Sequence, residues 1–296
     1  MEIELVTKGA RAVILPEFGG RLHQLHVEVV GREEPLLVTP PEIRDYSRAP
    51  LFGGSYPMAP WPNRVREGRF RFDGVDHVLP LNDGESALHG LVFDRPWRII
   101  ARTSRVCELI VELDDRWPWP GCVWQRYEIS PGRLRMKMEV RAERFSFPAG
   151  CGWHPWFRSE LGATRPLRVS VPASRRYVME ERIPTGEMME PSGQHDLRTA
   201  TLVHSGTLDD CYATLTGPIQ LEWGRVMMTV SVECAAPHVM VYTSPGAVCI
   251  EPQTCPPDAF NLASRMPGSF IEEMATPGKP VSLASSWTWS TGGHGS

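Results

Sequence analysis

Residues 134–140 read LRMKMEV, and their side chains alternate between apolar and charged along the whole stretch. Successive side chains of a β-strand point to opposite faces, so Leu134, Met136, Met138 and Val140 would share one face. The charged side chains between them would share the other. The stretch therefore predicts a strand that is buried on one side and exposed to water on the other.

Similar apolar or alternating runs recur along the chain. They occupy residues 11–15, 108–113, 167–171, 227–233, 239–243 and 286–290. The 26 glycines and 28 prolines are spread from end to end, which is typical of short elements joined by many turns. No long amphipathic helix is predicted, although residues 258–265 could form one or two helical turns. Frequent strands without helices between them predict an all-β protein with antiparallel sheets, as a large sandwich or barrel.

Residues 69–78, RFRFDGVDHV, predict a β-hairpin. The Asp73-Gly74 pair at its centre suits a two-residue type I′ turn, in which both residues need positive φ angles. Such a turn would place Arg71 directly opposite Asp76 across the two strands.

Length and charge limit the domain organisation and the partners. The 296 residues fit a single β domain over residues 1–291, with residues 292–296 as a disordered polar tail. The chain has 31 basic and 35 acidic residues, a net charge of −4, with both signs scattered. This balance excludes nucleic acid and anionic membranes as expected partners. With neither a signal segment nor an apolar run long enough to span a bilayer, we expect a soluble, cytoplasmic protein.

The seven cysteines are an odd number and form no C-x-x-C pair. They are typical of reduced, mostly buried thiols in a reducing compartment. Cys151 and His154 come nearest to a zinc-binding spacing, but no second pair of ligands accompanies them. No metal site is predicted.

Two stretches present polar side chains from rigid or tight backbone. In MAPWPNRV (residues 58–65), two prolines hold the chain extended around Trp61 and present Asn63 and Arg64, as polar ligand recognition requires. A surface turn with a solvated arginine is the competing interpretation. In ALHGL (residues 87–91), Gly90 would let a ligand or another backbone segment approach His89. A structural histidine in a half-buried loop explains the same pattern.

GCGWHPWF (residues 150–157) surrounds a histidine with aromatic residues. Pro155 favours extended backbone at His154, so this side chain should project from a strand or a strand end. Trp153, Trp156 or Trp61 could stack on the C–H face of a sugar ring while polar groups reach its hydroxyls. A core histidine wrapped in aromatic rings is the alternative, and the residues alone leave both open.

Two further stretches carry carboxylates. In LDDCY (residues 208–212), adjacent strand residues point to opposite faces, so at most one of Asp209 and Asp210 enters a given pocket. A charged turn would also account for this pair. The apolar run 247–250 precedes Glu251 and a proline that ends strand pairing. A carboxylate at the end of a buried strand is costly unless it is partnered, so Glu251 is either salt-bridged or functional.

Taken in order, these stretches resemble the aldose 1-epimerase (galactose mutarotase) family. The segments that carry the resemblance are PWPNRVREGRFRFDG, ALHGL, HPWF, IPTGE, LDDCY and IEPQTCPPDAFN, from about residue 61 to residue 261. Among its subgroups, PWPNRVREGRF is most similar to the bacterial epimerase-like branch. The resemblance implies a large antiparallel β supersandwich with an open cleft that binds an aldose sugar and needs neither a metal nor an organic cofactor.

The resemblance also implies roles for particular residues. Glu251 would remove the proton from the anomeric hydroxyl, and His154 would protonate the ring oxygen. Reference pKa values of ~4.3 and ~6.5 suggest an ionised carboxylate beside a protonated imidazole. We expect the two groups to face each other across a gap as wide as a pyranose. His89, Arg64 and Asp209 match substrate-binding positions of the family, and we also expect Asn63, Trp61, Trp156 and Gln253 to bind the substrate.

Other functions stay open at this stage. Many members of the family have glutamine where this chain has Met240. A sugar-binding or regulatory protein that has lost turnover is therefore the second hypothesis. A hexose 6-phosphate 1-epimerase is the third, and it would need a cationic clamp for the phosphate, for which Arg175, Arg176 and Arg182 are candidates. The sequence decides neither the sugar nor the oligomeric state.

Overall fold

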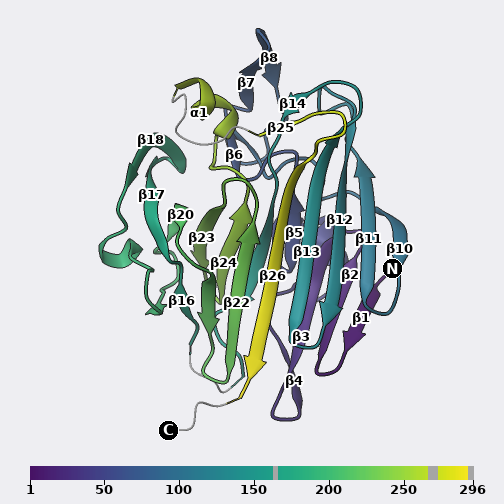
Figure 1. Ribbon diagram of the computed structural model, residues 1–296, viewed down its shortest axis with the longest axis vertical. Coiled ribbons are helices and arrows are strands. Elements are labelled where there is room, and N and C mark those ends of the chain that lie inside the picture. The colour runs from purple at the N-terminus through teal and green to yellow at the C-terminus, as the bar shows by residue number, and fades with distance from the viewer. Residues whose placement is uncertain (163–165, 266–272, 293–296) are drawn as a thin grey trace.

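The computed structural model describes residues 1–162, 166–265 and 273–292. In this part of the chain, two large antiparallel sheets pack against each other, one in front of the other in Figure 1. The predicted all-β class and sandwich architecture are confirmed. Of the tail predicted to be disordered, residues 293–296 lie outside the described residues.

The first sheet carries the candidate site and has eleven strands within the described ranges. Its order is β1-β2-β3-β5-β15-β24-β23-β20-β17-β18, and β4 pairs with β3 beside this path. The strands are β1 (Ile3–Thr7), β2 (Ala10–Leu15), β3 (Arg21–Val29), β4 (Arg32–Pro35), β5 (Ser55–Met58), β15 (Gly152–Arg158), β17 (Ala173–Glu180), β18 (Ile183–Met189), β20 (Asp209–Leu215), β23 (His238–Ser244) and β24 (Ala247–Gln253).

The second sheet has the order β10-β11-β12-β13-β26-β22-β21-β16-β19. These strands are β10 (Arg98–Arg102), β11 (Val106–Glu112), β12 (Gly121–Ser130), β13 (Arg133–Ala142), β26 (Val281–Thr291), β22 (Val226–Glu233), β21 (Ile219–Glu222), β16 (Arg168–Ser170) and β19 (Thr201–Leu202). Short ribbons and helices complete the described part: β6 (Arg64–Arg66) with β9 (Ser86–Leu88), β7 (Arg69–Phe72) with β8 (Val75–Val78), β14 (Phe147–Pro148) with β25 (Met274–Ala275), and η1 (Ile43–Ser47), η2 (Gly193–His195) and α1 (Ala259–Arg265).

The stretch 134–140 lies in β13, between β12 and β26 of the second sheet. Leu134, Met136, Met138 and Val140 are fully buried and belong to the large apolar cluster between the two sheets. The alternating pattern therefore identified both the strand and its buried face. The other runs expected to be strands overlap β2, β11, β16, β22, β23 and β26, and the helical turns at residues 258–265 correspond to α1.

The predicted hairpin is formed by β7 and β8, which project from one end of the molecule (Figure 1). Asp73 and Gly74 both have positive φ angles, 49° and 77°, as the type I′ turn requires. Arg71 pairs with Asp76, with Nη1 2.9 Å from Oδ1. Both side chains are largely exposed, so this ion pair contributes little to stability.

Side chains along β24 alternate between the two faces of the first sheet. Val248 and Ile250 point into the core between the sheets, whereas Glu251 lines a cavity outside it. His154 on β15 and Asp209 on β20 line the same cavity. The outer face of the first sheet, away from the second sheet, is therefore where the candidate residues gather. Among the described residues, no helix has the length and apolar character of a membrane span.

Candidate active site

A cavity of about 270 Å³ lies over the outer face of the first sheet. Small-molecule sites are commonly about 300 to 1,000 Å³, so this cavity suits a small ligand. It brings together most of the residues expected from the sequence: Asn63, Arg64, His89, His154, Trp156, Asp209 and Glu251. Leu51, Tyr56, Leu88, Arg182 and Tyr242 complete its walls. Tyr56 and Tyr242 carried no sequence signal, because each is one aromatic residue in an ordinary strand.

His154 and Glu251 are in direct contact, with Nε2 3.1 Å from Oε1. The expectation of a pyranose-wide gap between them is wrong. β15 and β24 are neighbouring antiparallel strands, and side chains on one face of such a pair lie about 5 Å apart. The two side chains therefore stand side by side on one wall of the cavity, where His154 is 5% exposed and Glu251 is 2% exposed.

Burial shifts the pKa values of both groups toward their uncharged forms. It lowers the pKa of His154 to about 3, with smaller effects from Arg64 and Arg21 in the same direction. It raises the pKa of Glu251 well above its ordinary value, an effect that Asp209 reinforces and Arg64 opposes. Burial therefore disfavours the ionised carboxylate and protonated imidazole expected from reference values, and it favours the form of the pair in which Glu251 holds the proton.

Two aromatic rings stack on the His154 imidazole. Tyr56, its partner across β5 and β15, stacks on the ring at 4.8 Å between centroids, and Trp156 stacks at 5.4 Å. Both stacks are nearly parallel, with interplanar angles of 20°. The two readings of GCGWHPWF are both partly right, because aromatic rings enclose the imidazole and it still lines the cavity. The stacking fixes the ring orientation and leaves its edge on Glu251.

His89 is held beside this pair by a tight connection to Asn63. The backbone N–H of Asn63 donates to His89 Nδ1 at 3.2 Å, and the backbone N–H of His89 donates to the Asn63 carbonyl at 2.8 Å. Both residues have positive φ angles, 55° and 61°, which are strained for residues with side chains. Since Nδ1 is an acceptor and burial lowers the pKa of His89 well below normal, the neutral ring carries its proton on Nε2. His89 is thus prepared to donate a hydrogen bond.

Gly90 permits the close packing of this loop. A Cβ atom on Gly90 would lie 2.0 Å from the carbonyl oxygen of Ala59, and the Gly90 φ angle is +77°. The close approach to Gly90 that the sequence suggested is therefore made by the backbone of Ala59. Its effect is to fix His89 against the segment that carries Asn63 and Arg64.

Arg64 lines the cavity, and an ion pair with Asp83 holds its guanidinium in position. Its Nε donates to Asp83 Oδ2 at 2.8 Å, and its Nη1 donates to Asn63 Oδ1 at 3.4 Å. The arginine side chain is mostly buried. Asp83 lies in the connection between β8 and β9, and nothing in its local sequence marks it as a partner for Arg64. The ion pair directs one guanidinium toward the cavity and restrains its movement.

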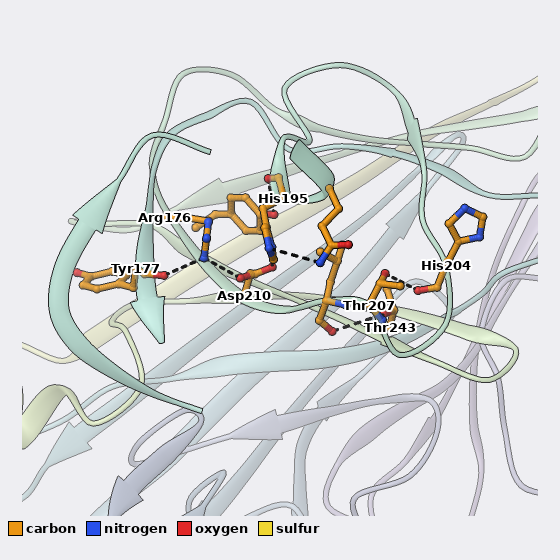
Figure 2. Close-up of polar contacts among 10 residues, drawn as sticks. Arg176, Tyr177, His195, His204, Thr207, Asp210 and Thr243 are labelled. Atoms are coloured by element: carbon orange, nitrogen blue, oxygen red, sulfur yellow. Dashed lines mark hydrogen bonds and ion pairs between the residues drawn. The ribbon is translucent and has the colours of Figure 1, made fainter. Parts of the chain in front are cut away.

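Asp209 and Asp210 have different partners. Asp209 lines the cavity, and Arg182 Nε lies 3.8 Å from its Oδ2. Burial raises the pKa of Asp209. Asp210 is instead bound by Arg176 Nη1 at 3.1 Å and by His195 Nδ1 at 2.7 Å (Figure 2). Asp209 is therefore the member of the pair that could contact a ligand in the cavity.

Two residues expected at the site do not line the cavity. Trp61 is 2% exposed, stacks on Trp117 at 5.7 Å and donates from Nε1 to the carbonyl of Ala87. It belongs to the apolar core, because the rigid segment that holds it turns the indole inward. Gln253 is fully buried, and its amide atoms have no hydrogen-bond partner among the described residues. Trp153 is also fully buried, so Trp156 is the tryptophan at this cavity.

Met240 lies opposite Glu251 in the register of β23 and β24. It is buried and packs with Tyr177, Cys211 and Ala213, away from the cavity lining. Met240 thus provides neither a hydrogen bond donor nor an amide oxygen next to Glu251. Whatever polar contacts a ligand makes in this cavity must come from the other residues.

The same site contains a possible set of metal ligands. Ligand atoms of His89, His154 and Glu251 all lie within 4.8 Å of one another, and all three residues are buried. Neutral imidazoles and a carboxylate are ligands that zinc and other transition metals accept. The arrangement can therefore act as an acid–base pair with a neighbouring donor, and a cation that entered it would compete for the same atoms.

Comparison with known proteins identifies relatives of this chain. Over 217 residues the chain is 24% identical to the uncharacterised protein YihR of Escherichia coli, a match that covers 69% of this chain and 70% of YihR. It is 26% identical to the galactose mutarotase of Sus scrofa over 179 residues, which are 57% of this chain and 52% of the mutarotase. The alignment thus spans about half the length of that relative.

Solved structures share the fold across nearly the whole chain. An aldose epimerase homologue from C. elegans matches with a TM-score of 0.84 at 18% identity, covering 98% of this chain and 99% of the homologue. Galactose 1-epimerase from Lactobacillus acidophilus matches with a TM-score of 0.80 at 20% identity, covering 98% and 94%. The family model described as aldose 1-epimerase matches residues 1–273. With a match of this extent, the chain belongs to the aldose 1-epimerase family.

Proposed function

We propose that this protein is a mutarotase that interconverts the α and β anomers of a free aldose. The observation that carries the proposal is the contact between His154 Nε2 and Glu251 Oε1 on the wall of a cavity of suitable size for a small ligand. Membership of the family supports an activity on aldoses, and the pair supplies the proton transfers that such an activity needs.

The reaction opens and recloses a cyclic hemiacetal. Opening removes a proton from O1 and adds one to O5, while the C1–O5 bond breaks and C1 becomes an aldehyde carbon. O1 and O5 are both bonded to C1, so acid and base must reach two atoms that are close together. Two adjacent groups on one wall meet this requirement better than groups on opposite walls. Each transfer contributes roughly 10² to 10⁴ in rate.

In the proposed sequence, Glu251 accepts the O1 proton and His154 donates to O5. The resting proton on Glu251 first moves to His154 across their 3.1 Å contact, which yields a carboxylate and an imidazolium. Arg64 favours the ionised form of Glu251 but also lowers the pKa of His154, so it helps the carboxyl to release the proton and does not help the imidazole to accept it. After rotation about the C1–C2 bond, O5 attacks the other face of the aldehyde and both proton transfers reverse. The pair returns to its starting state.

Arg64, His89 and Asp209 would hold the sugar during the rotation. Arg64 and the His89 Nε2–H are donors, and Asp209 is an acceptor while it is ionised. The close packing of His89 on Asn63 and the Arg64–Asp83 ion pair keep these groups in place before a ligand arrives. Such preorganisation lowers the entropic cost of reaching the reactive geometry.

The test is polarimetry on freshly dissolved α-glucose and α-galactose. We expect the wild-type protein to accelerate the approach to anomeric equilibrium well beyond the spontaneous rate for at least one of them. His154→Gln and Glu251→Gln should each abolish most of that acceleration. Wild-type rates in both variants would overturn the assignment.

A sugar-binding or regulatory role is the second candidate, and Met240 is the observation that favours it. Its side chain gives no polar contact near Glu251, at the position where many members of the family have glutamine. Calorimetry that detects sugar binding, together with no acceleration of mutarotation, would decide for this role.

A hexose 6-phosphate 1-epimerase is the third candidate, and it depends on arginines. Arg182 lines the cavity together with Arg64, whereas Arg176 is bound by Asp210 and Arg175 does not line the cavity. Of the three arginines considered from the sequence, one is therefore available for a phosphate. Mutarotation rates on glucose and glucose 6-phosphate, measured in one assay, would separate this candidate from the first.

A further inference from the structure

A second hollow, here called the side pocket, adjoins the catalytic cavity. It has a volume of about 520 Å³, and Leu51 and Trp156 line both spaces. The two hollows therefore share part of their walls. A ligand bonded to a sugar in the cavity could extend into it.

Aromatic rings form much of the wall of the side pocket. Phe52 is 36% exposed and meets Trp156 edge to face, with 5.0 Å between the ring centroids. Phe93 also lines the space. An exposed aromatic face held by a second ring is the surface on which the C–H face of a pyranose packs.

Polar groups surround these rings. Arg48, Asp94 and Arg116 line the pocket, and Arg116 is already paired with Asp114 at 2.8 Å. The charges are mixed, which favours a neutral ligand rich in hydroxyl groups over an anion. Trp156 Nε1 is buried and has no hydrogen-bond partner among the described residues. A buried donor without a partner, at the boundary between two hollows, is satisfied when a ligand provides an acceptor.

A third hollow, beyond Arg64 and Arg182, has different walls. It measures about 430 Å³ and is lined by charged residues such as Arg66, Glu67 and Glu85, and no aromatic side chain of the described residues lines it. It therefore lacks a flat apolar surface for a sugar ring. Of the side pocket and this third hollow, the side pocket fits a second pyranose.

We propose that the side pocket is a subsite for a second sugar ring. The preferred substrate is then a reducing disaccharide or a longer oligosaccharide, with its reducing-end residue in the cavity and the next residue against Phe52. This inference rests on the proposed function, because it places the anomeric carbon at His154 and Glu251.

The kinetic test compares glucose with maltose, cellobiose, lactose and isomaltose, which all have glucose at the reducing end. Exchange between anomeric proton signals in NMR reports the mutarotation rate of each sugar. We expect kcat/KM for at least one disaccharide to exceed that for glucose by about fivefold or more, as an added aromatic contact would give. Phe52→Ala should lower this ratio about fivefold.

Phe145→Ala is the matched control, because Phe145 is 61% exposed and lines neither hollow. It should leave the disaccharide-to-glucose ratio at the wild-type value. Arg48→Ala, a second exposed substitution in the side pocket, should lower the ratio in the same direction as Phe52→Ala. A ratio of one or less for all four disaccharides, or a ratio unchanged by Phe52→Ala, would overturn the subsite.

Calorimetry separates failure of the subsite from failure of the proposed function. If no sugar is turned over, yet a disaccharide binds more tightly than glucose and Phe52→Ala removes the difference, the mutarotase assignment fails and the subsite stands. If glucose is turned over and disaccharides bind no more tightly than glucose, the subsite fails and the mutarotase assignment stands.

Discussion

Asp209 and Asp210 are consecutive residues of β20, yet Asp209 lines the cavity of the candidate site and Asp210 is bound between Arg176 and His195. The alternation of side chains along a strand accounts for this division of roles. Matched substitutions at the two positions should therefore differ in effect: a change at Asp209 should lower activity, and a change at Asp210 should lower stability.

We expect Asp209→Asn to lower kcat/KM for mutarotation by roughly tenfold or more, with little change in the melting temperature. Asp210→Asn should instead destabilise the protein by about 2 kcal/mol, because it removes a buried carboxylate that Arg176 and His195 both bind. At a temperature where both variants are folded, Asp210→Asn should turn over sugar at nearly the wild-type rate. Polarimetry and thermal unfolding of the two variants check this, and an exchange of the two effects would contradict it.

Asp83 is expected to act through Arg64. Asp83→Asn should raise KM by about fivefold and change kcat less, because the guanidinium loses the charged partner at 2.8 Å that restrains it. Arg64→Lys should have a larger effect in the same direction, since lysine cannot contact both Asp83 and the cavity with one planar group. Steady-state kinetics on both variants and on the double variant provide the measurement. If Asp83→Asn adds its full effect in the Arg64→Lys background, the two residues act independently and the proposed role of Asp83 is wrong.

The stability of the protein should depend on pH through Glu251. In the unfolded chain this carboxyl ionises near 4.5, whereas burial keeps it protonated to a higher pH in the folded protein. The folded state therefore holds more protons above pH 4.5, and its stability falls as the pH rises. His154 has the opposite dependence, since its lowered pKa costs stability as the pH falls from 6.5 toward 3.

Glu251→Gln removes the carboxyl group whose raised pKa costs stability at high pH, and it leaves His154 in place. We expect this variant to be inactive and more stable than the wild type at pH 8, by about 1 to 2 kcal/mol, with the difference vanishing near pH 4. Urea unfolding at a series of pH values measures it. A variant less stable than the wild type at pH 8 would show that the carboxyl is ionised in the folded protein.

The local features of the fold were predictable because they depend on neighbours in the sequence. The alternation from Leu134 to Val140 lies within a single strand. The turn at Asp73-Gly74 follows from the conformational preferences of these two residues. The same holds for the opposite faces of Asp209 and Asp210. These predictions needed no knowledge of how the strands are ordered.

The features that depend on strand order were not predictable in this way. His154 and Glu251 touch because β15 and β24 are neighbours, although long segments separate them in the chain. Their shifted pKa values follow from burial, which reference values ignore. Trp61 was expected at the site as a stacking surface for the sugar, but the segment that holds it turns the indole into the core.

The absence of a metal requirement is still a prediction. Mutarotation should persist at its full rate after dialysis against EDTA. Added Zn²⁺ should inhibit it competitively with the sugar, since His89, His154 and Glu251 offer ligand atoms within 4.8 Å. Loss of activity on chelation, restored by one metal, would show that these groups hold a cofactor.

The central claim is that His154 and Glu251 act as one unit that exchanges a proton with the sugar. The most direct measurement is the polarimetric mutarotation rate of His154→Gln, Glu251→Gln and the double variant, with circular dichroism to verify folding. We predict that each single variant loses at least about 10² in rate and that the double variant is no slower than the slower single variant by more than about threefold. Either single variant retaining the wild-type rate, or losses that multiply in the double variant, would contradict the claim.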